Sequence, residues 1–142
     1  FQNKTKKLLK YLDKNKLITP HQAEFHRLFP SVKKNLNNKE KVMKFLKLCK
    51  SNILLKGNVT VIGSPRNIII NTHTSNELAV IGSGDVLAGI IASLVGDKKM
   101  FMNEAASAAT WLHGDIAKRY GKGLISEDLI KGLPNALQKL KK

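Results

Sequence analysis

The sequence of this 142-residue chain predicts an α/β fold. Short apolar segments alternate with longer segments of helical periodicity, which is the pattern of a sheet covered by helices. The apolar segments, such as Ile53-Leu54-Leu55, lack the polar alternation of a half-exposed strand, so we expect a sheet with both faces covered. The helices need more sheet than these strands supply, and we therefore expect sequence outside this chain to complete it.

The first 51 residues predict three helices and one strand. Leu8, Leu9 and Leu12 mark the end of an amphipathic helix. Pro20 ends a short strand and suits the first turn of the helix that follows. The clearest helical period of the chain comes after a polar stretch. The expected elements are a helix over 4–12, a strand over 17–19, a helix over 21–29, a loop over 31–38 and a helix over 40–51.

The remaining residues predict a strand, a β-hairpin and a series of helices. The hairpin turns at Ser64-Pro65-Arg66, and Gly121 and Gly123 end an Ala-rich helix. Ser126 can cap a short helix, and Pro134 suits the first turn of a last one. The expected elements are a strand over 53–55, hairpin strands over 60–62 and 67–71, a loop over 72–81, and helices over 83–95, 103–120, 126–131 and from 134 onward.

The net charge of +15 is concentrated near the start of the chain. Residues 1–50 carry 14 basic and 3 acidic side chains, whereas residues 51–142 carry 11 and 7. Four lysines recur at helical spacing opposite apolar residues, which predicts a solvated helix face made of Lys41, Lys44, Lys47 and Lys50. Aromatic residues are few and Lys far outnumbers Arg, so we expect no nucleic-acid partner.

Composition excludes several other classes of protein. The single cysteine, Cys49, cannot form an intramolecular disulfide, which favours a reducing, cytoplasmic location. No apolar run approaches the roughly 20 residues that span a bilayer, so we expect no membrane association. No cluster of His, Cys, Asp or Glu has metal-ligand spacing, so we expect no protein-held metal. The first residue is Phe1 rather than Met, which suggests that the chain is part of a longer one.

The motif Gly82-Ser83-Gly84-Asp85 precedes a strongly apolar helical run. Small residues let backbone amides approach a ligand, and the start of a helix leaves amides unpaired near the positive end of the helix dipole. The motif therefore suits a phosphate group, and Asp85 suits a base that takes a proton from the group attacking it. The alternative is that Ser83 and Asp85 only cap the helix.

Two weaker motifs lie at expected strand ends. Lys56 and Gly57 follow a buried strand and precede the hydroxyl of Thr60, a combination that can bind phosphate, although a plain strand-to-turn step has the same pattern. His21 follows Thr19-Pro20 and is expected in the first helical turn, where it either binds a ligand or is simply exposed. The other histidines indicate no site: His113 suits packing or a polar network, and His26 and His73 have no partner pattern.

These motifs occur in an order that resembles one known family. Thr19-Pro20-His21-x-x-Glu24, Leu55-Lys56-Gly57-x-x-Thr60, the 82–91 segment, Leu112-His113-Gly114 and the 123–130 segment resemble the ADP/ATP-dependent NAD(P)H-hydrate dehydratases, which belong to the ribokinase-like superfamily. The resemblance covers essentially the whole chain. It implies that residues 1–142 are the C-terminal portion of a single ribokinase-like domain, with helices on both faces of a layered sheet and its N-terminal part missing.

The resemblance also implies a reaction and a role for each motif. The family repairs hydrated NADH and NADPH: a nucleotide phosphoryl group is transferred to the hydroxyl of the hydrated ring, and phosphate then leaves. The implied roles are base and substrate contact for Asp85, substrate contact for His21, an anion hole for Gly82, Ser83 and Gly84, and nucleotide contacts for Gly84 and for Lys56, Gly57, Asn58, Val59 and Thr60. ADP or ATP with Mg²⁺ is the implied co-substrate, and self-association or association with a missing N-terminal half is the implied assembly.

The chain departs from the family pattern at several places. Val80-Ile81-Gly82 stands where Thr-Gly-Gly is usual, and a β-branched Ile81 is expected to crowd the phosphate loop and to resist a positive φ. Gln22-Ala23 stands where Pro-Gly is usual. These departures leave two alternatives open: another ribokinase-like small-molecule kinase, or an inactive remnant of the dehydratase domain.

Overall fold

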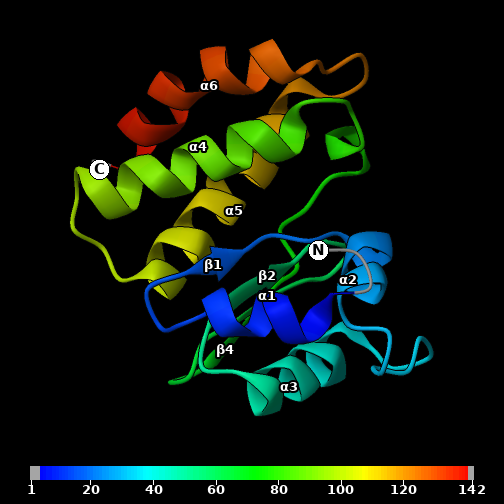
Figure 1. Cartoon of the computed structure of the whole chain (residues 1–142). Helices are drawn as coiled ribbons and strands as arrows, with labels where there is room; N and C mark the ends of the chain where they lie inside the picture. The colour runs from blue at the N-terminus through cyan, green and yellow to red at the C-terminus, as the bar shows by residue number, and fades with distance from the viewer. Residues whose placement is uncertain (1–3, 141–142) are drawn as a thin grey trace. The chain divides into compact units, whose positions relative to one another are not determined.

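A computed structural model describes residues 4–140 (Figure 1). The chain divides into two compact units, Phe1–Ile70 and Asn71–Lys142, and each has its own buried residues. The expectation of one domain over residues 1–142 stays a prediction, and its ends, residues 1–3 and 141–142, lie outside the described part.

The first unit contains a four-stranded sheet in the order β1-β2-β3-β4. β1 runs parallel to β2, with Leu17 opposite Asn52, whereas β2 and β3 are antiparallel, with Leu54 opposite Ile62. The predicted hairpin between β3 and β4 is confirmed, since the amide of Ser64 donates to the carbonyl of Asn67 at 2.9 Å. The elements of this unit are α1 (Thr5–Tyr11), β1 (Leu17–Ile18), α2 (Gln22–Leu28), α3 (Asn38–Leu48), β2 (Asn52–Leu55), β3 (Thr60–Gly63) and β4 (Ile68–Asn71).

The core of the first unit lies between its helices and the sheet. β2 and β3 are buried along their whole lengths, and α3 packs on both strands. Three rings form the centre of this core: the centroids of Phe25 and Phe29 are 5.2 Å apart, as are those of Phe29 and Phe45. The prediction that 53–55 is a buried strand is thereby confirmed.

Helix α3 differs from its prediction at its start, at its end, which is Leu48 rather than residue 51, and in the burial of one lysine. It begins at Asn38, inside the predicted loop, because Asn37 caps it: the Asn37 side chain accepts from the amide of Glu40, and the Glu40 carboxylate accepts from the amide of Asn37. The prediction that Lys41 is solvated is wrong, since it is 6% exposed. Lys41 and Phe45 are four residues apart and therefore share the buried face, whereas Lys44, Lys47 and Lys50 are exposed.

The second unit is helical. Helices α4 and α6 both pack on α5 (Figure 1), and the predicted bounds of α4 and α5 agree with the structure within one residue. The predicted loop over 72–81 contains one short 3₁₀ turn, in which the Ser75 hydroxyl accepts from the amide of Glu77. The elements are η1 (Asn76–Leu78), α4 (Ser83–Gly96), α5 (Met102–Tyr120) and α6 (Ser126–Lys139).

The prediction of two separate C-terminal helices is wrong. Helix α6 continues through Pro134, although a proline inside a helix removes one backbone hydrogen bond. Leu129 and Ala136 lie seven residues apart on one buried face, so the apolar stripe continues past the proline. Close packing on α5 adds to this, since a Cβ at Gly132 would lie 2.5 Å from Cγ2 of Ile116.

Candidate functional site

His21 and Lys56 are brought together by the sheet. Beyond the end of β1, His21 pairs with Lys56 in a parallel bridge, and the amide of Lys56 donates to the carbonyl of Pro20 at 2.9 Å. Parallel strands end at the same edge of a sheet, so two residues 35 positions apart in sequence become neighbours at the edge where ligands commonly bind. Their predicted roles in binding stay predictions.

His21 is the N-cap of α2 rather than a residue of its first turn. Its Nδ1 accepts from the amides of Ala23 at 3.1 Å and Glu24 at 3.3 Å, while a Glu24 carboxylate oxygen accepts from the His21 amide at 2.8 Å. An accepting Nδ1 carries no proton, so the neutral ring carries its proton on Nε2. The half-exposed ring thus offers an N–H donor, 3.4 Å from the other oxygen of Glu24.

The predicted nucleotide segment 56–60 forms the tight turn between β2 and β3. Gly57, Asn58 and Val59 are exposed, whereas Thr60 is buried and its hydroxyl donates to the carbonyl of Gly57 at 3.2 Å. The hydroxyl therefore already has a partner within the turn. Glycine at position 57 lets the turn lie close to Asn38, because a Cβ there would be 2.9 Å from Nδ2 of that residue.

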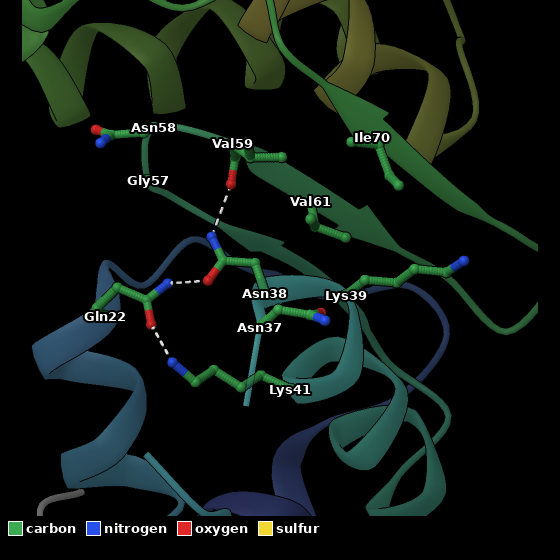
Figure 2. Close-up of a pocket in the computed structure, with 10 residues that line it drawn as sticks. All are labelled: Gln22, Asn37, Asn38, Lys39, Lys41, Gly57, Asn58, Val59, Val61 and Ile70. Atoms are coloured by element: carbon green, nitrogen blue, oxygen red, sulfur yellow. Dashed lines mark hydrogen bonds between the residues drawn. The ribbon is translucent and has the colours of Figure 1, made fainter. Parts of the chain in front are cut away.

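Side chains from α2 and α3 support this turn at a pocket of about 750 Å³ (Figure 2). Asn38 Nδ2 donates to the carbonyl of Val59 at 2.7 Å, and Gln22 Nε2 donates to Asn38 Oδ1 at 2.6 Å. Lys41 Nζ donates to Gln22 Oε1 at 2.7 Å. Sequence reasoning missed Gln22, Asn38 and Lys41. The pocket is lined by Gln22, Asn37, Asn38, Lys39, Lys41, Gly57, Asn58, Val59, Val61 and Ile70.

The 82–85 motif opens α4 in the second unit. Gly82 is the N-cap and has a φ of +84°, a left-handed conformation that favours glycine. Its carbonyl accepts from the amides of Asp85 at 3.0 Å and Val86 at 3.1 Å, so the helix closes directly after the glycine. The amide of Ser83 donates to the carbonyl of Val80 at 3.3 Å, whereas that of Gly84 has no acceptor within residues 4–140. Gly84 therefore supplies a free donor at a helix N-terminus.

Of the two side chains in the motif, that of Ser83 is buried and that of Asp85 is exposed. The Ser83 hydroxyl donates to the carbonyl of Leu78 at 2.8 Å, and this buried serine therefore holds the approach to the helix. The buried His113 has its Nε2 3.0 Å from the carbonyl of Ser83 and must donate to it, which agrees with the prediction that it serves packing or a polar network. Asp85 is exposed in the first turn of α4 and lines a groove of about 480 Å³ between α4 and α6.

The expectation that Ile81 crowds the phosphate loop stays a prediction, whereas the residue does not itself take up a positive φ. Its side chain is 99% exposed, and Lys99 is the one residue other than glycine with a positive φ in the described chain. The left-handed conformation falls on Gly82 instead, so the β-branched neighbour is accommodated without backbone strain.

A second cluster in this unit was not expected from the sequence. The rings of His73 and Trp111 are stacked, with centroids 5.1 Å apart. His73 Nδ1 lies 3.2 Å from Nζ of Lys118, and its Nε2 lies 3.8 Å from a carboxylate oxygen of Asp115. Asp115 also pairs with Arg119 along α5. An aromatic residue and a carboxylate four positions apart on one helix were the available signal for a partner of His73.

No three His, Cys, Asp or Glu side chains of residues 4–140 are grouped as metal ligands would be. Within the same range, none of the helices combines the length and the apolar character of a membrane span.

Comparison with known proteins identifies the family. A family model described as NAD(P)H-hydrate dehydratase matches residues 1–135. An ADP-dependent (S)-NAD(P)H-hydrate dehydratase of Neisseria meningitidis is 38% identical over 107 residues, which cover 73% of this chain and 36% of that protein. A bifunctional NAD(P)H-hydrate repair enzyme of Archaeoglobus fulgidus is 32% identical over 127 residues, which cover 88% of this chain and 26% of that one.

Solved structures confirm the predicted ribokinase-like fold. The ADP/ATP-dependent NAD(P)H-hydrate dehydratase of Bacillus subtilis, co-crystallised with ATP and Mg²⁺, matches with a TM-score of 0.73 and 29% identity over 87% of this chain and 47% of that one. A ribokinase-like protein of Enterococcus faecalis matches with a TM-score of 0.77 and 27% identity over 89% and 45%. The chain thus spans less than half the length of each of these four proteins. The match of residues 1–135 shows that the chain belongs to the NAD(P)H-hydrate dehydratase family.

Proposed function

We propose that this chain supplies the nucleotide-binding and phosphoryl-transfer residues of an ADP/ATP-dependent NAD(P)H-hydrate dehydratase. The observation that carries the proposal is the start of α4, where Gly82 takes up a left-handed conformation, Gly84 presents a free amide and Asp85 is exposed. A helix N-terminus with a free amide stabilises an anion, and a carboxylate in the same turn is placed to accept a proton.

The proposed reaction has two steps. Asp85 accepts the proton of the ring hydroxyl while that oxygen bonds to the terminal phosphorus of the nucleotide, and the bond from this phosphorus to the bridging oxygen breaks. The carbon–oxygen bond of the phosphorylated ring then breaks, inorganic phosphate departs, and a neighbouring ring carbon loses a proton so that the double bond returns. The amide of Gly84 stabilises the negative charge on the transferred group.

For the residues of the first unit we propose separate roles. Lys56 neutralises nucleotide phosphate, the exposed turn at 57–59 contacts the nucleotide, and His21 donates through Nε2 to the hydrated dinucleotide. Mg²⁺ arrives with the nucleotide, because it prefers phosphate oxygens and water to a cage of protein ligands. Self-association, or association with a chain that carries the other half of the family domain, stays a prediction that sedimentation of the purified chain tests.

Calorimetric titration of the purified chain with ADP, and with ATP plus Mg²⁺, tests the proposal. We expect saturable binding that weakens about tenfold in Lys56→Met, because a charged contact to phosphate is lost. Lys44→Met is the matched control, since Lys44 is an exposed lysine of α3. A folded chain that binds neither nucleotide contradicts the proposal and favours the inactive remnant.

Product analysis separates the proposed activity from the alternative kinase. Hydrated NADH is incubated with the chain, nucleotide and Mg²⁺, and the reduced nicotinamide and free phosphate formed are both measured. Equal amounts of restored NADH and free phosphate support dehydration. A stable phosphorylated alcohol without free phosphate is the product of a kinase, and would replace the dehydratase with that alternative.

A further inference from the structure

Lys41 is a buried cation with a neutral partner. It is 6% exposed, and its ammonium donates to Oε1 of Gln22 at 2.7 Å. None of the ion pairs within residues 4–140 includes Lys41. Buried charges are usually paired with opposite charges. Here the ammonium bonds to an amide oxygen instead, and because the bond is buried, the positive charge polarises that amide strongly.

The polarised amide begins a directed series of hydrogen bonds. Lys41 can only donate and the carbonyl of Val59 can only accept, so the two ends fix the orientation of both amides between them. Gln22 must turn its oxygen to Lys41 and its Nε2 to Asn38, and Asn38 must turn its Nδ2 to Val59. Figure 2 shows these bonds joining α2 and α3 to the turn between β2 and β3. We call Lys41, Gln22, Asn38 and the Val59 carbonyl the relay.

We propose that Gln22, Asn38 and Lys41 are positioning residues that hold the 57–59 turn in its nucleotide-binding conformation. The turn is exposed and short, and the Asn38 side chain lies against both of its ends. Nδ2 of Asn38 lies 2.7 Å from the carbonyl oxygen of Val59, and a Cβ at Gly57 would lie 2.9 Å from this Nδ2. The effect on affinity rests on the proposed nucleotide site, whereas the effect on the turn does not.

Gln22→Glu separates this role from a general contribution to stability. A glutamate still accepts from Lys41 and gives that buried cation an opposite charge. It has no donor for Asn38, so Asn38 must rotate its amide to donate to the glutamate, which turns Oδ1 toward the carbonyl of Val59. Two acceptors then face each other and the last bond of the relay is lost. We expect unchanged or higher thermal stability together with weaker nucleotide binding.

The experiment compares Gln22→Glu, Gln22→Ala and Asn38→Ala with the wild-type chain. Nuclear magnetic resonance follows the carbonyl carbon of Val59, whose chemical shift depends on its hydrogen bond, and calorimetry gives the Kd for ADP and ATP. We expect the Val59 carbonyl to shift in all three variants and the Kd to rise about three- to tenfold, as for loss of one hydrogen bond. Gln138→Ala, an exposed glutamine of α6, is expected to change neither.

Each outcome decides one part of the proposal. An unmoved Val59 carbonyl in Gln22→Glu and Gln22→Ala overturns the relay, whether or not the chain binds nucleotide. A shifted carbonyl with a wild-type Kd overturns the link from the relay to nucleotide affinity. A wild-type chain that binds no nucleotide refutes the proposed function, while the resonance of Val59 still decides whether the relay orders the turn.

Discussion

His21 and Lys56 face each other across a parallel bridge at one end of the sheet, although 35 residues separate them in sequence. One of them caps α2 and the other begins the β2–β3 turn. A single backbone hydrogen bond, from the Lys56 amide to the Pro20 carbonyl, therefore sets the spacing between the predicted substrate contact and the predicted nucleotide contact.

Substitution of His21 can separate its role as the N-cap of α2 from its role as an Nε2–H donor. Asparagine is a good N-cap but lacks the Nε2 donor, so His21→Asn should leave the midpoint of thermal unfolding near that of the wild type. The KM for hydrated NADH should rise about tenfold, as for loss of a hydrogen bond to a polar substrate, with an unchanged Kd for nucleotide. His21→Ala should also destabilise α2 by about 1 kcal/mol. Equal KM values for His21→Asn and wild type would remove His21 from the substrate site.

Asp85→Asn tests the assignment of the base. Asparagine keeps the size of the side chain and cannot take the proton of the attacking hydroxyl, so kcat should fall about a hundredfold or more. Nucleotide affinity should hold or improve, because a negative charge near the phosphates is removed. Single-turnover kinetics and calorimetry measure the two effects. Turnover near the wild-type rate would show that another group accepts the proton.

Gly82→Ala tests the left-handed N-cap. A φ of +84° is unfavourable for alanine, and the added Cβ would lie 3.0 Å from the hydroxyl oxygen of Ser126. We expect the free energy of unfolding to fall by about 1–2 kcal/mol, as measured by urea denaturation. Gly89→Ala is the matched control: nothing lies within 4 Å of its Cβ position, and it is a helical glycine in the same α4, so it should stabilise the chain. Equal losses in both variants would contradict a special role for Gly82.

The stability of the chain should depend on pH through His26. Burial, and then the charges of Lys41 and Lys34, lower the pKa of His26 below its ordinary value of 6.5. The unfolded chain therefore takes up this proton first as the pH falls, so the free energy of unfolding is highest above 6.5 and decreases below it, until the folded form also becomes protonated.

Urea denaturation at a series of pH values between about 7.5 and 5.5 measures this dependence, in a range where most carboxylates stay ionised. The His26→Gln variant should lose the His26 contribution and show a flatter profile than the wild type. Parallel profiles for the two proteins would contradict the assignment.

The sequence predicted the elements that depend on local pattern. Helices α4 and α5 follow from periodicity and glycine stops, and the β3–β4 hairpin follows from its turn residues. The errors lie where packing overrides the local signal: α6 continues through Pro134 because its apolar face continues, and Lys41 is buried because it shares a face with Phe45. Pairing of β1 with β2 is a long-range contact that no local pattern specifies.

Residue type alone suggested the members of the candidate site, and their roles stay predictions. The left-handed backbone of Gly82 and the exposure of Asp85 come from the structure. The supporting residues Gln22 and Asn38 were not predictable, because an amide side chain signals no role until its partners are known. Their partners come from other elements, 16 and 21 positions away in sequence.

The fluorescence of Trp111, which stacks on His73, can show whether the two units unfold together. Trp111 is the single tryptophan of the sequence and lies in the second unit, so its fluorescence follows the unfolding of that unit, whereas far-ultraviolet circular dichroism follows the helices of both. Coincident denaturation curves from the two signals mean that the units unfold as one thermodynamic body, and separated curves give each unit a stability of its own.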